Sequence, residues 1–177
     1  MLLVPTSSAW ANHGLQEVAS RGPIGGNGPW DGAFCGATPD GSAVFVVTQE
    51  KLTSDDTDNF RDVYRYSGGV TTLMSTGPNG GNGAFHAFCT GVSGGVSADG
   101  SHLFFRTAEK LDISDTDTSL DLYDRNIATG TTALVSIGPA GGNGGQTVFY
   151  RGSSSNGACV WFGTFEKLTT DDTDTSY

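Results

Sequence analysis

The chain has 177 residues, 36% of them hydrophobic, and a formal net charge of −10 at pH 7. This charge excludes nucleic acid and anionic membrane surfaces as expected partners, because both require a basic face. The sequence also has no apolar run of about 18 residues, so we expect no transmembrane segment.

Two markers recur in step along the chain. The segment Gly-Pro-x-Gly-Gly-Asn-Gly occupies residues 22–28, 77–83 and 138–144. The tripeptide Glu-Lys-Leu follows at residues 50–52, 109–111 and 166–168. Internal repeats of this length are typical of propellers and related arrays. We therefore interpret residues 1–177 as one all-β propeller segment, with these parts: permuted outer strands at 1–21, repeat 1 at 22–76, repeat 2 at 77–137 and an incomplete repeat 3 at 138–177.

The first repeat predicts four antiparallel strands. A Thr-Pro-Asp-Gly turn at 38–41 separates the first strand from a β-branched and aromatic run. Alternating polarity marks the third strand, and a Ser-Gly-Gly hairpin turn at 67–69 leads into the fourth. The four expected strands are 32–38, 43–48, 62–66 and 70–75.

The second and third repeats follow the same pattern to different extents. In the second repeat, a first strand ending at the 97–100 turn precedes strands at 102–107, 121–125 and 131–136. Its first-strand region carries a short insertion around 92–95. The third repeat has expected strands only near 148–150 and 158–164.

The missing strands of the third repeat have a candidate source at the other end of the chain. Residues 15–23 match a fourth strand running into the glycine-rich segment, and residues 8–11 match a weak third strand. We therefore expect residues 14–20 to pair as an outer strand with the last repeat of this chain or of a partner. Because a closed propeller needs about 4–8 blades, three repeats imply either a longer chain or a homodimer.

The turn at 97–100, the strand after it and Asp121-Leu122-Tyr123 resemble the WD-like repeat of TolB-type β-propellers. In that family an (S/T)-x-D-G turn joins the first two strands of a blade, and a hydrophobic-Tyr pair opens the third. Glu109-Lys110-Leu111 with Asp115-Thr116-Asp117 is similar to repeat arrays of bacterial propeller proteins that are expected to be secreted. The resemblance therefore implies the fold and an extracellular or periplasmic location, and implies no activity.

Aspartates gather in the loops between the second and third strands of each repeat. Calcium takes about 6–8 oxygen ligands, which alternating aspartates in a flexible loop can supply. The pattern is also similar to the calcium loops of integrin-type propellers, although no Asp-Gly follows the second aspartate. The alternative is that these side chains form Asx-turns with their own loop amides. The candidate metal ligands are Asp56, Asp58, Asp62, Asp115, Asp117, Asp121, Asp172 and Asp174.

The glycine-rich segments are interpreted as crossings between repeats, with several residues at positive φ. They lack the Lys-Ser/Thr and the helix of a phosphate loop. In a propeller they share one face with the Asp-rich loops. We expect most aromatic residues after these segments to be core between blades, with one or two exposed as a stacking platform. They are Trp30, Phe34, Phe85, Phe88, Phe149 and Tyr150.

The cysteines and histidines give little support for catalysis or redox chemistry. Cys35 and Cys89 occupy equivalent positions, and we interpret them as buried free thiols because no metal or redox spacing is present. His13, His86 and His102 fall at non-equivalent positions, and none lies beside a serine or cysteine nucleophile in sequence.

The sequence therefore predicts a non-enzymatic binding or scaffold module, with calcium as its only candidate cofactor. Its expected partner is a protein or glycan bound on the loop face. Two other functions remain open. One is the non-catalytic propeller domain of a larger hydrolase, and the other is a calcium-dependent glycan-binding lectin.

Overall fold

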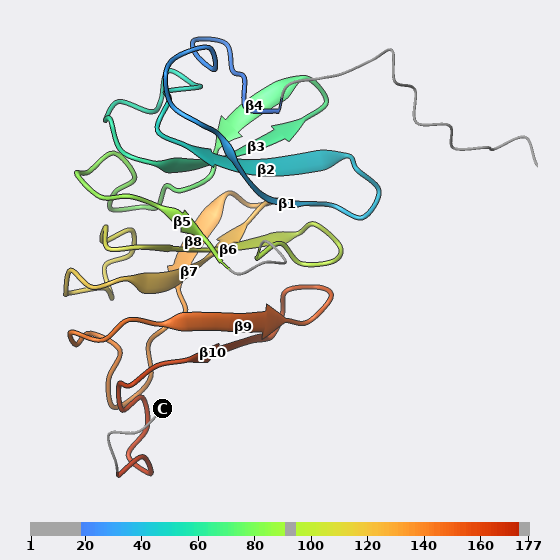
Figure 1. Ribbon diagram of the computed structural model, residues 1–177. Helices are drawn as coiled ribbons and strands as arrows, with labels where there is room; N and C mark the ends of the chain where they lie inside the picture. The colour runs from blue at the N-terminus through green and yellow to red at the C-terminus, as the bar shows by residue number, and fades with distance from the viewer. Residues whose placement is uncertain (1–18, 91–94, 174–177) are drawn as a thin grey trace, which may run out of the picture.

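The computed structural model describes residues 19–90 and 95–173, which are all-β and contain no helix (Figure 1). The first sheet contains β1 (Ala33–Ala37), β2 (Ala43–Thr48), β3 (Asp62–Ser67) and β4 (Val70–Leu73). The second contains β5 (Phe88–Cys89), β6 (His102–Thr107), β7 (Asp121–Asn126) and β8 (Thr131–Leu134). The third contains β9 (Phe149–Ser153) and β10 (Val160–Gly163).

Each four-stranded sheet is an antiparallel meander in sequence order, as the first two repeats predict. The three sheets follow one another as stacked layers and do not close into a ring (Figure 1). Two predictions fall largely outside the described residues, namely the strands at 8–11 and 14–20. Ala19 and Ser20, at the described end of the second segment, lie in a turn. No helix in the described residues is long and apolar enough to cross a bilayer.

Two of the three core clusters lie between successive sheets, and the third packs residues of the first sheet and its loop against Ala19. Phe104 and Phe105 are adjacent in β6 and are both buried, because neighbouring residues of a strand point to opposite faces. Phe105 packs in the cluster with Phe45 of the first sheet, and Phe104 packs with Val160 and Phe162 of the third. The sequences of the central strands are therefore continuous apolar runs. Burying each large apolar side chain fully stabilises the folded state by about 1.5–3 kcal/mol.

The turns between the first two strands are built from the same contacts in successive sheets. Asp40 accepts hydrogen bonds from the amide and hydroxyl of Ser42, at 3.0 and 2.8 Å. Asp99 accepts the equivalent bonds from Ser101, at 3.0 and 2.6 Å. These bonds lower the pKa of each aspartate to about 2. The predicted Asp-Gly turn is thus present in both repeats, with Gly100 at a φ of 73°.

The expectation of free thiols is wrong for Cys35 and Cys89, which form a disulfide between β1 and β5. Their Cα atoms lie 5.4 Å apart although 54 residues separate them in sequence. Equivalent cysteines meet because the first strands of two consecutive sheets lie next to each other. Cys159 is a free, exposed cysteine.

Removing this disulfide should destabilise the protein. In the chain-entropy model a cross-link over such a loop contributes about 4 kcal/mol. For a chain of this size, we expect Cys89→Ser to lower the melting temperature by on the order of 10 °C. Differential scanning calorimetry measures the change, with Cys159→Ser as the control that leaves the melting temperature unaltered. Equal melting of Cys89→Ser and wild type would contradict a cross-link in the folded protein.

Candidate metal centre

Three aspartates of the first sheet converge on one point. Asp56 and Asp58 come from the loop between β2 and β3, and Asp62 is the first residue of β3. One carboxylate oxygen from each lies within 4.8 Å of one from the others. Asp56 and Asp62 are only 4% and 5% exposed, so two of the three carboxylates are withdrawn from water.

The surrounding residues fix the orientation of these carboxylates. The Tyr64 hydroxyl donates to Asp56 Oδ2 and lies 3.2 Å from the carbonyl oxygen of Glu50. The Ser75 hydroxyl, just beyond β4, donates to Asp62 Oδ1 at 2.6 Å. Strand and loop residues together therefore hold the cluster in place.

The second sheet builds the same cluster from Asp115, Asp117 and Asp121, whose carboxylate oxygens again lie within 4.8 Å of one another. Tyr123 donates to Asp115 Oδ2, and Ser136 donates to Asp121 Oδ1 at 2.6 Å. Six of the eight predicted ligands are thus brought together in two groups of three.

The remaining two predicted ligands belong to the third loop. Asp172 is described, and its amide donates to the carbonyl of Thr169, as the amide of Asp115 donates to that of Asp112. Asp174 lies outside the described residues. The third loop therefore begins with the turn used in the other repeats, and its carboxylate cluster is not described.

Several carboxylate oxygens in the two clusters have no hydrogen-bond donor, although they are buried. In the first cluster these are Asp56 Oδ1 and Asp62 Oδ2. In the second they are Asp117 Oδ2 and Asp121 Oδ2. A buried unpaired polar atom costs about 1–3 kcal/mol, and more when it is charged. A cation between the carboxylates would remove this cost.

The pKa values of the same carboxyl groups are shifted as well. Burial and the neighbouring carboxylates raise the pKa of Asp62 to about 8 and that of Asp121 to about 7. Burial also raises the pKa values of Asp56 and Asp115. Carboxylates gathered without a counter-charge resist ionisation, whereas a bound cation would favour the ionised form.

The Asx-turn interpretation accounts for only part of the cluster. Asp58 accepts the amide of Phe60 at 2.6 Å, and Asp117 accepts the amide of Ser119 at 2.5 Å. These two side chains do close local turns. Such turns do not account for Asp62 and Asp121, the buried aspartates that begin β3 and β7. The carboxylate of each accepts a hydrogen bond from a serine hydroxyl just beyond the last strand of its sheet.

The glycine-rich segment has a second role that its sequence did not reveal, because it binds the glutamate of the Glu-Lys-Leu tripeptide. Glu109 Oε1 accepts the amides of Gly81, Asn82 and Gly83 at 2.7, 3.1 and 2.9 Å. Glu50 and Glu166 are bound by the equivalent segments of their own repeats. The strict co-recurrence of the two markers was the signal that could have identified this contact.

The glycine-rich segment of one repeat also holds the Asp-rich loop of the preceding repeat. Asn82 Oδ1 accepts the Thr57 amide at 2.6 Å and its hydroxyl at 3.0 Å. Asn143 Oδ1 accepts the Thr116 amide at 2.7 Å. Each threonine stands between two aspartates of a cluster. The predicted sharing of one face by the two kinds of loop is therefore confirmed by direct contact.

The aromatic residues after the glycine-rich segments are more exposed than predicted. Phe88 and Tyr150 are half-buried, and the other four are exposed by 37–71%: Trp30, Phe34, Phe85 and Phe149. The interpretation that most of them are core is wrong. They lie on or before the first strand of each sheet, which is an edge strand and has a neighbouring strand on one side only.

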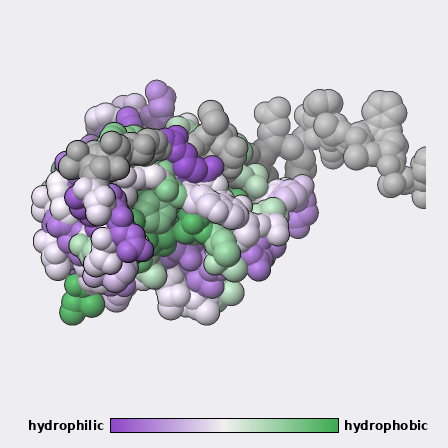
Figure 2. Space-filling view, turned by 90° about the horizontal axis from the view of Figure 1, so that it is seen from below, coloured by the Kyte–Doolittle hydropathy of each residue, from purple (hydrophilic) through white to green (hydrophobic). Residues whose placement is uncertain are grey.

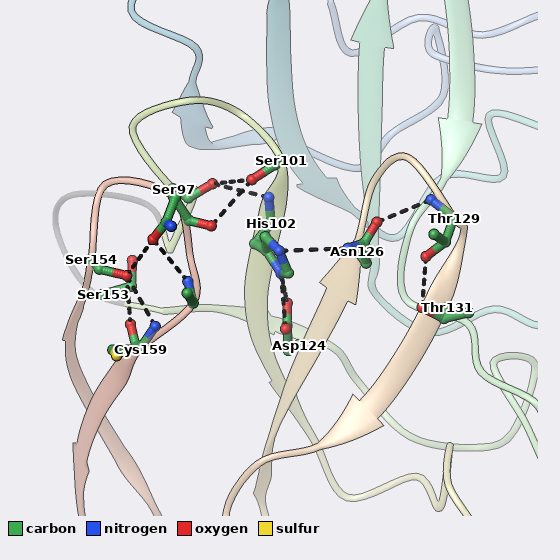
Figure 3. A network of polar contacts seen from close by, with 12 residues as sticks. Ser97, Ser101, His102, Asp124, Asn126, Thr129, Thr131, Ser153, Ser154 and Cys159 are labelled. Carbon is green, nitrogen blue, oxygen red and sulfur yellow. Dashed lines mark hydrogen bonds and ion pairs between the residues drawn. The ribbon is translucent and has the colours of Figure 1, made fainter.

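A second polar network surrounds His102 of β6 (Figure 3). The Nδ1 atom lies 2.8 Å from an oxygen of Asp124, and Nε2 lies 3.5 Å from Asn126 Nδ2. The nearby Ser97 hydroxyl accepts the backbone amide of His102 instead of contacting the ring. Among the described residues, no serine or cysteine is bonded to this imidazole, so the pair lacks the nucleophile of a triad.

Comparisons with protein families, curated proteins and solved structures find no match to this chain. The assignment of the site therefore depends on the chemistry of its own residues. That chemistry consists of two largely buried, oxygen-only clusters at equivalent places in two sheets.

Replacing the glutamate that the glycine-rich segment binds should lower the free energy of unfolding. Glu109→Ala leaves three backbone amides without their acceptor, and bonds to a charged group are worth about 1.5–3 kcal/mol each before compensation by water. We expect a loss of about 2–3 kcal/mol in the free energy of unfolding, measured by urea denaturation. Asp31→Ala, which removes an exposed carboxylate, is the control and should change it by less than about 0.5 kcal/mol. Equal losses in both variants would contradict the role of Glu109.

The clusters should also make stability depend on pH when metal is removed. Asp62 and Asp121 keep their protons in the folded chain at pH values where the unfolded chain has lost them. The folded state is therefore favoured most below about pH 4, and this contribution is lost as pH rises toward 7–8.

Urea denaturation with a chelator at pH 5 and pH 8 measures this dependence. We expect the double variant Asp62→Asn, Asp121→Asn to lose less stability between the two pH values than wild type, while Asp31→Asn loses the same amount. Identical pH dependence in wild type and the double variant would show that these carboxyls do not titrate as described.

Proposed function

We propose that this chain is a calcium-stabilised, non-enzymatic binding module of the β-propeller type. The observation that carries the proposal is the pair of three-carboxylate clusters whose buried oxygens lack donors. The clusters occur at the same place in two sheets. Repetition favours a structural or binding role, because an active site usually requires one unique constellation.

Calcium fits the clusters better than other common metals. Every candidate ligand is an oxygen, which disfavours zinc because zinc prefers histidine and cysteine. Magnesium demands near-ideal octahedral geometry and keeps several of its waters, whereas calcium accepts irregular sets of about 6–8 oxygens. Asp56, Asp58 and Asp62 would supply carboxylates to one ion, and Asp115, Asp117 and Asp121 to another, with water completing each shell.

The propeller architecture is supported by the meander order of the sheets and by their successive stacking. The TolB-type resemblance of the second repeat supports the same arrangement. A disulfide between the first two sheets and a calcium requirement both suit an extracellular or periplasmic location. The module could equally serve as the non-catalytic propeller domain of a larger hydrolase.

The proposed binding surface is the face that carries the glycine-rich and Asp-rich loops. Its partner would be a protein or a glycan. The exposed side chains of Trp30 and Phe85, which are 53% and 38% exposed, favour the lectin variant of this function. Aromatic rings on an exposed surface can stack on apolar sugar faces, and a calcium ion beside them can bind hydroxyl groups.

Isothermal titration calorimetry with calcium tests the metal site. We expect two ions per chain, and the double variant Asp115→Asn, Asp117→Asn should bind one fewer. At calcium 100-fold above the dissociation constant, each lost ion should remove about 2.7 kcal/mol of stabilisation. Asp31→Asn controls for the change in charge and should bind as wild type. Absence of binding heat at millimolar calcium, with unchanged melting, would falsify the metal proposal.

A further inference from the structure

The two aspartate clusters have the same ligands but different neighbours. Two residues after Asp58 the chain has Phe60, whereas the equivalent residue after Asp117 is Ser119. The amide of each donates to the aspartate before it, so the two backbones make the same turn and only the side chains differ. The repeat accounts for what the two clusters share, and it leaves the aromatic ring beside the first cluster unexplained.

Two rings from the start of the second repeat lie next to Phe60. The ring centroid of His86 is 5.0 Å from that of Phe60, and the ring centroid of Phe88 is 6.2 Å from that of His86. Both pairs meet edge to face, as aromatic rings prefer. We call these three side chains the aromatic shelf. The equivalent positions beside the second cluster hold Ser119, Thr147 and Phe149.

Backbone groups fix the aromatic shelf beside the first cluster. The amide of Arg61, which directly precedes Asp62, donates to His86 Nδ1 at 2.9 Å. The carbonyl of Arg61 accepts the amide of Ala87 at 2.7 Å. Because Nδ1 of His86 accepts, the ring carries its proton on Nε2, which is a hydrogen-bond donor. All three side chains of the shelf are half-buried, so part of each ring is open to solvent.

The first cluster is also more open to solvent than the second. In the second cluster Asp117 Oδ2 is buried without a donor, and the amide of Asp117 donates to Asp115 Oδ1 at 3.2 Å. In the first cluster both buried, unpaired oxygens belong to other aspartates, so Asp58 Oδ2 is open to solvent. Three aspartates supply only part of the about 6–8 oxygens that calcium takes. An ion in the first cluster would therefore keep water that a ligand can replace.

The surroundings of the loops favour a polar, uncharged ligand. The loops lie on the left of Figure 1, and Figure 2 shows this side from below as mainly hydrophilic and neutral, with the apolar patch at the centre of the view. The net charge of −10 opposes the approach of an anion. A neutral sugar combines hydroxyl oxygens, which calcium binds, with a face of C–H groups that can lie on an aromatic ring.

We propose that the first cluster and the aromatic shelf form a glycan subsite, and that the second cluster holds an ion with a structural role only. The ligand is a neutral hexopyranose with two adjacent hydroxyl groups. These hydroxyls replace water on the calcium ion held by Asp56, Asp58 and Asp62. The apolar face of the sugar lies on Phe60, and His86 Nε2 donates to one of its oxygens. This inference rests on the proposed function, because it requires calcium in the first cluster.

Saturation-transfer NMR titrations of the whole chain test the subsite with the methyl glycosides of mannose, glucose, galactose and fucose. We expect at least one of them to bind in calcium and none to bind in chelator. Phe60→Ser, which introduces the residue of the second cluster, should weaken this binding by about tenfold. Calorimetry should still count two calcium ions in this variant. The matched control is Ser119→Ala, which should bind the sugar as wild type does.

A second pair of variants tests which cluster binds the sugar. Asp58→Asn and Asp117→Asn make the same change at equivalent positions, and each should weaken calcium binding at its own cluster only. We expect sugar binding to be lost in Asp58→Asn and kept in Asp117→Asn. Circular dichroism melting in calcium verifies that each variant is folded. If Phe60→Ser does not fold, this pair of aspartate variants decides alone.

The outcomes separate this inference from the proposed function. Two bound calcium ions without binding of any of the four glycosides overturn the glycan subsite and leave the calcium-stabilised module standing. Absence of calcium binding overturns both. Sugar binding that persists in chelator, or that Phe60→Ser leaves unchanged, overturns the subsite as well. Equal loss of sugar binding in Asp58→Asn and Asp117→Asn contradicts the difference between the two clusters.

Discussion

The bond between a glutamate carboxylate and a glycine-rich turn organises this protein. In each repeat the glutamate of Glu-Lys-Leu accepts backbone amides from the segment that precedes it by more than twenty residues. The glycine-rich turn and the Glu-Lys-Leu segment approach each other closely, since a Cβ atom at Gly77 would lie 2.3 Å from the carbonyl oxygen of Leu111. Gly81, at a φ of 129°, supplies a backbone shape that other residues rarely adopt. The turn thus requires glycine for space and for conformation.

The glycine-rich turn also positions the Asp-rich loop of the neighbouring repeat. The asparagine that it presents binds the threonine between two cluster aspartates of the preceding repeat. On the other side of that loop, Lys51 donates to the carbonyl of Thr57 at 2.9 Å. The carboxylates are therefore brought together by contacts outside the cluster, against their mutual repulsion. Two divalent ions would offset four of the ten net negative charges of the chain.

Apart from β5, the strands were predictable to within a few residues because local signals mark them. The first strand of the second repeat was expected to end at the 97–100 turn, but β5 ends at Cys89, eight residues earlier. Apolar runs predict β2 and β6, and the Asp-Gly turns just before them mark where these strands begin. The aspartate clusters were predictable because each loop is short and repeats its spacing. The disulfide and the exposed aromatics were not, since both depend on which edge strands lie together. Nothing in residues 33–37 alone tells which neighbour β1 meets. The closing role proposed for residues 14–20 falls mainly outside the described chain.

Asn82 and Asn143 each bind a threonine of the preceding repeat, Thr57 and Thr116, so the second repeat carries one half of the contact on each side. This contact is therefore directional, and both of its halves are encoded within a single unit. A tandem duplication of the coding segment would add a unit that already fits its neighbours on both sides. Arrays of this kind can lengthen or shorten by whole repeats without compensating substitutions, because each added contact uses the same pair of residue types.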